Sequence, residues 1–74
     1  MSSEYAVILV HATSHAMRVE KLLHDAGIPC KMIPVPRQIS SDCGACVRIR
    51  HQDMDAARLV VEAAHMEVES IQAM

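Results

Sequence analysis

Two cysteines separated by two residues, Cys43 and Cys46, are the residues of this sequence best suited to chemistry. Cys43 lies in the polar segment PVPRQISSDCG. The thiolate is the reactive form of cysteine, and it is favoured beside the positive end of a helix dipole or beside arginine or protonated histidine. Gly44 removes side-chain bulk next to the sulfur, so that a partner's backbone can approach. We predict that Cys43 is a reactive thiol, although its residue type alone also fits a small loop residue without chemistry.

Cys46 leaves two interpretations open. If the chain after Gly44 is an extended strand, residues three apart lie roughly 10 Å apart, which exceeds the roughly 7 Å limit of a disulfide. Cys46 can then resolve a bond on Cys43 only if Gly44 and Ala45 turn tightly, as a CxxC thiol redox pair would require. Otherwise we expect Cys46 on the outer face of its strand.

A zinc site is a further alternative. His11-x3-His15 together with Cys43-x2-Cys46 has the spacings of a tetrahedral Cys2His2 site. His11 ends a predicted strand, whereas His15 lies one turn into a predicted helix, so their imidazoles need not converge. We therefore expect neither a metal nor another cofactor, and keep zinc binding as an alternative.

Several polar residues near Cys43 are candidates for binding its cargo or a partner. They are Arg37, Ser40, Ser41, Gly44, Thr13 and Ser14. Arg37 can hold a negatively charged sulfur or a partner's carboxylate, although a solvated loop arginine is the alternative. No base and acid accompany the serines, so a serine nucleophile is excluded. Cys30 alternates with apolar residues and is predicted to be a core residue.

Composition restricts the function further. The 74 residues predict a single domain, 1–74, with a thin core built without Phe or Trp and with one Tyr. The net charge is −2, and no basic patch with stacking aromatics occurs, which argues against nucleic-acid binding. The apolar run Tyr5–Val10 is too short for a membrane span or a signal peptide. Three cysteines, an odd number, and no signal favour the cytoplasm.

Hydrophobic periodicity predicts six elements. A continuous apolar run predicts a central strand covered by helices over residues 5–10. A helix capped by Thr13 or Ser14 follows and ends at Gly27. Two strands are expected over 28–33, ending by Pro34, and over 45–50. A second helix, capped by Asp53 or Asp55, and a short strand over 67–71 complete the chain.

The order βαββαβ predicts an α/β (α+β) ferredoxin-like two-layer sandwich, an antiparallel sheet with two helices on one face. Strands 5–10 and 45–50 are expected at its centre. This topology predicts that the polar and reactive residues share one edge of the sheet: His11, Thr13, Ser14, His15, Pro36, Arg37, Ser40, Ser41, Cys43 and Gly44. The short last strand could pair with a second copy, which predicts a homodimer.

The segment IPVPRQISSDCG, with upstream Thr13, Ala16, Glu20, Gly27 and Ile28, resembles the small bacterial domains of the DUF3343 family, the Se/S carrier protein-like family. The resemblance covers nearly the whole chain. It implies a carrier that holds sulfur or selenium as a persulfide or perselenide on Cys43. A donor such as a cysteine desulfurase would load it and an acceptor protein would discharge it, so that any activity is at most sulfurtransferase-like.

Two residues depart from the family's pattern. His11 stands where family members carry an apolar or aromatic residue, and Cys46 is not a general feature of the family. Attack by Cys46 on a Cys43 persulfide would release sulfide and leave a disulfide. A non-catalytic interaction domain, in which the PVPR loop docks a partner, is the last alternative.

Overall fold

The computed structural model describes residues 4–37, 39 and 44–73, and two helices pack on a four-stranded sheet in this part of the chain. The elements are β1 (Tyr5–Leu9), α1 (Thr13–Asp25), β2 (Cys30–Pro34), β3 (Ala45–Arg50), the short 3-10 helix η1 (His51–Asp53), α2 (Met54–Ala63) and β4 (Ser70–Ala73). Neither α1 nor α2 combines the length and the apolar character that crossing a bilayer requires.

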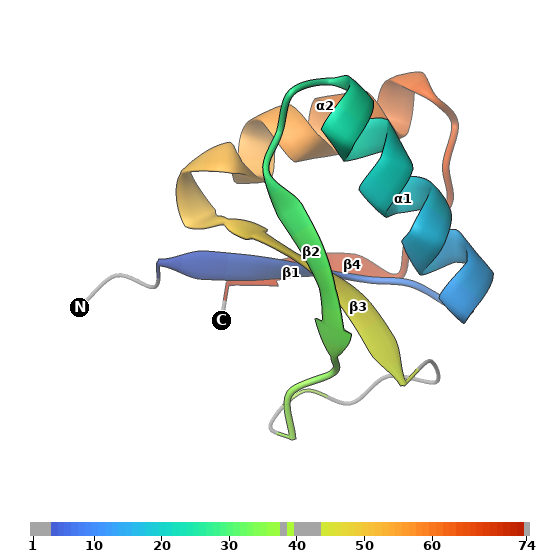
Figure 1. Ribbon diagram of the computed structural model, residues 1–74, viewed down its shortest axis with the longest axis vertical. Helices are drawn as coiled ribbons and strands as arrows, with labels where there is room; N and C mark the ends of the chain where they lie inside the picture. Colours follow the sequence, from blue (N-terminus) through green and yellow to red (C-terminus); the bar gives the residue numbers. More distant parts are fainter. Residues whose placement is uncertain (1–3, 38, 40–43, 74) are drawn as a thin grey trace.

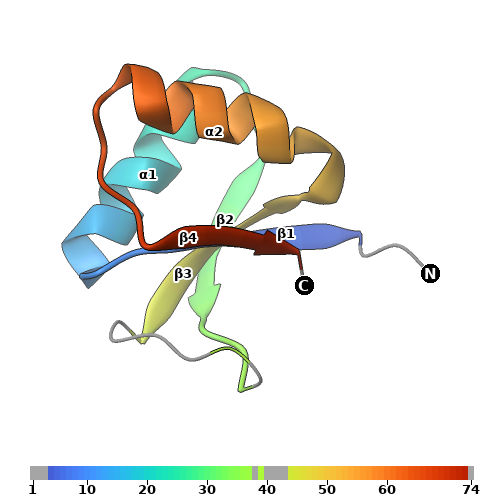
Figure 2. The ribbon, with the colours of Figure 1, turned by 180° about the vertical axis from the view of Figure 1, so that it is seen from behind.

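The sheet has the strand order β2-β3-β1-β4, and every neighbouring pair is antiparallel. Both helices lie on the same side of this sheet, as Figure 1 and Figure 2 show from opposite directions. The prediction of a ferredoxin-like two-layer sandwich with β1 and β3 at its centre is therefore confirmed. The topology follows from two crossovers, each of which carries a helix across the same face.

The main core lies between the sheet and the helices. Alternate residues of β1, Ala6 and Ile8, point into it because successive side chains of a strand face opposite sides. The helices contribute small or branched side chains at helical spacing, so the layers approach closely without aromatic rings. The buried members of this core are Ala6, Ile8, Val10, Ala16, Val19, Leu23, Ile28, Val47, Ile49, Ala57 and Val61.

A second apolar cluster covers part of the opposite face of the sheet, which we call the open face because no helix lies on it. Its buried members are Val7, Leu9 and Cys46, and partly buried Ile33, Val35 and Ile39 pack against them. The sequence predicted that helices would cover β1. They cover one face only, and the segment that follows β2 covers part of the other.

The ends of the helices differ in part from the predicted caps. Ala12 is the N-cap residue of α1 and Thr13 and Ser14 are already helical, so the predicted cap by either side chain is wrong. Asp53 is the N-cap of α2, after the unpredicted η1, but its side chain makes no capping hydrogen bond. β4 begins at Ser70, three residues later than the predicted strand over 67–71.

Side chains of α1 form hydrogen bonds with backbone groups along the outer edge of β2. The Met32 amide donates to a carboxylate oxygen of Glu20 at 3.2 Å, and the imidazole Nε2 of His24 lies 3.2 Å from the Cys30 carbonyl oxygen. Glu20 and His24 are four residues apart and therefore project from the same face of the helix. Polar groups that an edge strand leaves unpaired are thus used within the chain.

Both helices end in the same hydrogen-bonded turn. At the end of α1 the amides of Gly27 and Ile28 donate to His24 and Leu23, and Gly27 has φ 79°. At the end of α2 the residue in the equivalent position is His65, with φ 54°. Glycine adopts this left-handed conformation without cost, whereas any other residue is strained by its Cβ.

The two turns predict that substitutions at Gly27 and at His65 change the free energy of unfolding in opposite directions. Gly27→Ala should lower the free energy of unfolding by about 1 kcal/mol, since a Cβ there meets no atom within 4 Å and only the backbone conformation is penalised. His65→Gly should raise it by about 0.5–1 kcal/mol for the converse reason. Urea denaturation followed by circular dichroism measures both values. Ala63→Gly, inside α2, is the control and should destabilise; equal effects of Ala63→Gly and His65→Gly would contradict the assignment.

Candidate functional site

The candidate site is built on the loop between β2 and β3. The loop is closed at its base, where the Val35 amide donates to the Gly44 carbonyl oxygen at 3.2 Å. A turn follows Pro36, whose carbonyl oxygen accepts from the Ile39 amide at 3.0 Å. Ile39 packs on the apolar cluster of the open face. The chain is therefore fixed to the sheet on both sides of residues 40–43.

Three predicted site residues, Ser40, Ser41 and Cys43, lie outside the described residues. Ile39 and Gly44, at the two ends of the stretch 40–43, are described. Gly44, which directly follows Cys43 in the sequence, is exposed, and a Cβ built on it would meet no atom within 4 Å. The backbone beside Cys43 is thus open to an approaching molecule on the Gly44 side.

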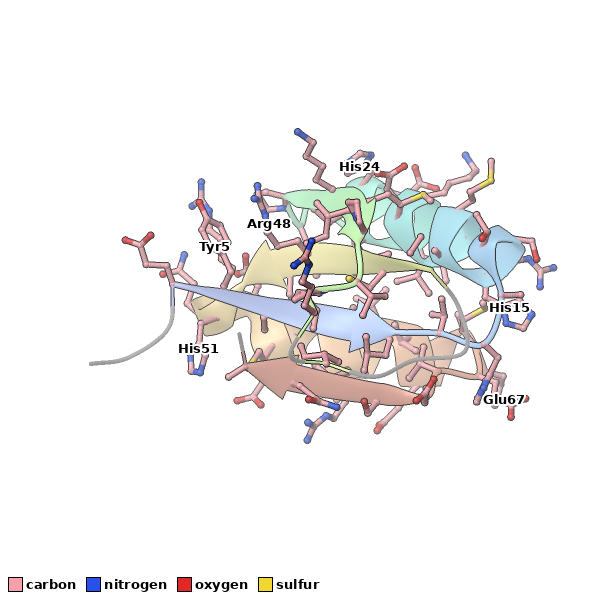
Figure 3. All side chains as sticks on the ribbon, turned by 90° about the horizontal axis from the view of Figure 1, so that it is seen from below. Tyr5, His15, His24, Arg48, His51 and Glu67 are labelled. Atoms are coloured by element: carbon pink, nitrogen blue, oxygen red, sulfur yellow. The ribbon has the colours of Figure 1, made fainter. Side chains whose placement is uncertain are left out.

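The start of α1 and the start of β3 lie at the same end of the sheet. Leu9 is the register partner of Cys46, so His11 and Gly44, each two residues beyond this pair, fall at one end. Figures 1, 2 and 3 agree on this arrangement. Arg37 is exposed, and the described residues that directly follow β2 lie on the side of the sheet opposite to the helices. These residues and the start of α1 therefore reach this end of the sheet from opposite sides.

The first turn of α1 has the features of an anion-attracting helix end. Thr13 and Ser14 are exposed and no acidic residue occurs in this turn. The backbone amides of a first turn have no intrahelical acceptor, and the helix dipole places partial positive charge there. His15 is half-buried, and among the described residues its Nδ1 atom is buried without a hydrogen-bond partner.

Cys46 is completely buried. Its exposed fraction is 0%, and it lies in β3 between its register partners Leu9 and Ile33. Its side chain points to the open face, as predicted, but the apolar cluster covers it there. A CxxC redox pair requires a tight turn at Gly44 and Ala45. Ala45 instead belongs to β3, where it is the register partner of Pro34, so Ala45 is extended and takes no part in such a turn.

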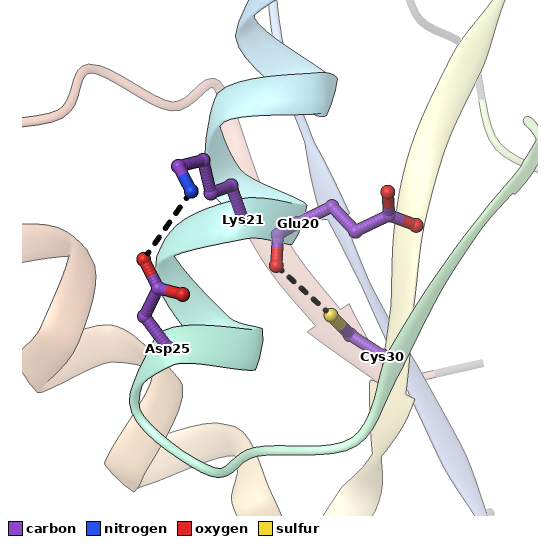
Figure 4. A network of polar contacts seen from close by, with 4 residues as sticks. All are labelled: Glu20, Lys21, Asp25 and Cys30. Atoms are coloured by element: carbon purple, nitrogen blue, oxygen red, sulfur yellow. Dashed lines mark hydrogen bonds and ion pairs between the residues drawn. The ribbon is translucent and has the colours of Figure 1, made fainter.

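Cys30 lies on the helical side of the sheet. Its thiol donates to the Glu20 carbonyl oxygen at 3.5 Å (Figure 4). Burial and, as the smaller cause, the negative charge of Glu20 raise the pKa of the Cys30 thiol above its ordinary value. Cys30 is therefore held as a neutral thiol beside α1, in agreement with its predicted place in the core.

The part of the chain that the structure describes contains no group of three or more His, Cys, Asp or Glu side chains that could hold a metal ion. His11 is exposed and His15 is half-buried at the start of α1. The Cys2His2 alternative includes Cys43, which lies outside this part of the chain, so zinc binding stays an untested alternative.

Sequence reasoning overlooked the apolar residues that hold the loop on the sheet. Ile33, Val35 and Ile39 form the cover of Cys46. The signal was present, because Ile33 and Val35 keep the two-residue alternation of β2 beyond Pro34. Pro34 and Pro36 predict the end of a strand, and this stronger signal masks the alternation.

Burial of Cys46 predicts that its thiol reacts slowly in the native protein. In the native protein, iodoacetamide at neutral pH should label Cys46 at less than about one hundredth of its rate in urea, because alkylation requires the strand to open first. Peptide mapping by mass spectrometry after timed quenching measures the rate at each cysteine. Native labelling of Cys46 at the unfolded rate would contradict its burial.

Cys30 serves as the internal comparison in the same experiment. A raised pKa leaves a smaller thiolate fraction at any given pH, so Cys30 should react more slowly than free cysteine at neutral pH and gain rate as the pH rises. A Cys30 rate equal to that of free cysteine between neutral and alkaline pH would contradict the raised pKa.

Comparison with known protein families agrees with the resemblance that the sequence pattern indicates. A family model described as "Putative Se/S carrier protein-like" matches residues 4–72, which include the whole β2–β3 loop. Neither a curated protein nor a solved structure matches the chain. The family match covers nearly all of the sequence, and the chain therefore belongs to the Se/S carrier protein-like family.

Proposed function

We propose that this protein is a carrier that holds sulfur or selenium as a persulfide or perselenide on Cys43 and passes it to an acceptor protein. The observation that carries the proposal is the family match over residues 4–72, which includes Cys43 and its loop. Burial of Cys46 and the raised pKa of Cys30 support Cys43 as the thiol that loads, because both other thiols are hindered.

Loading is a transfer between thiols without net oxidation. The Cys43 thiolate attacks the outer sulfur of a persulfide on the donor, a bond forms between Cys43 and that sulfur, and the donor's cysteine leaves as a thiolate. Delivery repeats the step, with the acceptor's thiolate attacking the outer sulfur and Cys43 leaving as a thiolate. Selenium would be transferred by the same two steps, again without net oxidation. A cysteine desulfurase is the class of donor that this chemistry suits.

The proposal gives the neighbouring groups an electrostatic role. A persulfide is anionic, and partial positive charge at the start of α1 and the guanidinium of Arg37 would lower the free energy of that anion. Thr13, Ser14, Ser40 and Ser41 would donate hydrogen bonds to it or to the partner. Exposure of Arg37, Thr13 and Ser14 and the open space at Gly44 support this assignment.

Cys46 would act only if it left its cluster. Its attack on the inner sulfur of a Cys43 persulfide would expel hydrosulfide and form a Cys43–Cys46 disulfide. Extended Ala45 and the complete burial of Cys46 oppose this step in the native fold, so we propose that the persulfide persists until an acceptor arrives. We also propose one domain working in the cytoplasm, where thiols stay reduced.

Incubation with a cysteine desulfurase and cysteine should add the mass of one sulfur atom to the protein. The gain should map to the peptide that contains Cys43, because this thiol alone is proposed to be reactive in the native fold. Cys43→Ser should lose the gain completely. Intact-mass and peptide mass spectrometry, before and after reduction, measure it.

Cys30→Ser is the matched control and should load as the native protein does, since Cys30 is bound to α1 on the other side of the sheet. A loss of two hydrogens that links Cys43 to Cys46 would replace the carrier by the redox alternative. Bound zinc that requires Cys43 and Cys46 would replace it by the metal alternative. If none of these three changes were observed, only the alternative of a non-catalytic interaction domain would remain.

A further inference from the structure

The half of the open face that the apolar cluster does not cover is positively charged. Lys31 and Arg48 are register partners on β2 and β3, and Arg50 follows Arg48 on the same face of β3. We call Lys31, Arg48 and Arg50 the cationic patch. It holds three of the seven Lys and Arg residues of a chain whose net charge is −2. Positive charge is thus concentrated on one face of an acidic protein.

Within the described part of the chain, no ion pair to Lys31, Arg48 or Arg50 is found. The ion pair found there joins Lys21 to Asp25, 3.8 Å apart on α1 (Figure 4). Lys31 and Arg50 are exposed. Like charges directly opposite each other on neighbouring strands destabilise a sheet, so pairing Lys31 with Arg48 lowers stability unless a negative group from outside lies between them.

Tyr5 holds Arg48 in place. The guanidinium carbon of Arg48 lies 4.3 Å from the centroid of the Tyr5 ring, and Figure 3 shows both side chains on the open face. Stacking on a ring orients a guanidinium and leaves its N–H groups, which lie in its plane, able to donate to carboxylates. The patch borders a shallow hollow of ≈ 200 Å³ that Tyr5, Lys31, Arg48 and Arg50 help to line.

We propose that the cationic patch docks an acidic, extended segment of a partner protein. Arg48 and Arg50 are two residues apart on a strand, roughly 7 Å, which is also the spacing of alternate side chains in an extended chain. Alternate carboxylates of such a segment therefore meet successive arginines, and Lys31 takes a carboxylate from the side. Charge complementarity orients the partner over this face, since the rest of the molecule carries the net negative charge.

The geometry favours a protein segment over other anions. Arg48 and Arg50 follow one another along β3, so the cationic groups form a row along the strand that several carboxylates of an extended segment match better than one phosphate does. Binding of single-stranded nucleic acid relies on aromatic rings on which bases stack, and this chain has one aromatic residue, Tyr5, over whose ring the Arg48 guanidinium already lies.

The patch also lies close to the candidate site. Arg48 is four residues beyond Gly44 along β3, roughly 13 Å in an extended strand. A partner bound to the patch therefore lies beside the strand that follows Cys43 in the chain. That this partner is the sulfur donor or acceptor rests on the proposed function, whereas the docking itself does not.

Titration of the ¹⁵N-labelled full chain with a peptide of alternating glutamate and valine tests the proposal. Amide shifts should concentrate on Lys31, Arg48 and Arg50, and the apparent affinity should fall as salt is added. In Lys31→Glu/Arg50→Glu the affinity should fall about tenfold or more. The control Arg18→Glu/Arg58→Glu carries the same change in net charge on the exposed surfaces of α1 and α2, and its affinity should change less than about twofold.

Equal losses in the two double variants, or amide shifts spread over α1 and α2, would overturn the proposal. Displacement of the peptide by equimolar inorganic phosphate or by a short oligonucleotide would overturn it as well. The shifts of the native protein decide the question even if a variant does not fold. Cys43→Ser should bind the peptide as the native chain does, so a failure of sulfur loading and a failure of docking are separate results.

Discussion

The arrangement of this protein depends on one constraint, the need to cover a central strand that is apolar on both faces. All residues of β1 after Tyr5 are buried, and so is Val10 beyond it. Two helices cover one face only, because both crossovers of the fold run on the same side. If Val7 and Leu9 were left exposed, the fold would lose roughly 1.5–3 kcal/mol of burial free energy for each of them. Another segment therefore has to lie over them.

The segment after β2 meets this constraint and thereby positions the candidate site. Val35 and Ile39 of this segment, together with Ile33 of β2, supply the missing apolar cover, and the hydrogen bond between Val35 and Gly44 closes the loop. The same packing buries Cys46 beneath the loop. Loop attachment and the exclusion of Cys46 from solvent are thus two results of one contact. The remaining half of the open face keeps its cationic side chains, so that one surface offers an anchored loop beside a charged docking area.

Much of the fold follows from local patterns in the sequence. The continuous apolar run of β1, the helical spacing of Ala16, Val19 and Leu23, and the position of Gly27 predicted the topology. The predicted cap of α1 was wrong because Ala12, which has no side chain able to cap, occupies the N-cap position. The N-cap of α2 is Asp53, one of the two predicted residues, although its side chain makes no capping hydrogen bond. The start of β4 was misplaced because its register is set by Leu9 and Ser70 across the sheet, which local periodicity does not contain.

The candidate site was predictable in composition more than in arrangement. The motif around Cys43 and its membership in the carrier family could be read from residue types and spacing. Burial of Cys46 is less direct to predict, because the alternation of Ile33 and Val35 indicates an apolar face but not that Val35 and Ile39 pack against the cluster that contains Cys46. The charged half of the open face also depends on register, which makes Lys31 a neighbour of Arg48 although they are far apart in the sequence.

The account rests on the packing of the loop against the open face, and methyl NMR measures this contact directly. In the full chain with labelled Ile, Leu and Val methyl groups, the Ile39 methyls should show nuclear Overhauser effects to methyl groups of Val7 or Leu9. Ile39 methyl shifts at unfolded values, without any such effect, would contradict it. The loop would then be unattached, and the link between the buried Cys46 and the candidate site would be lost.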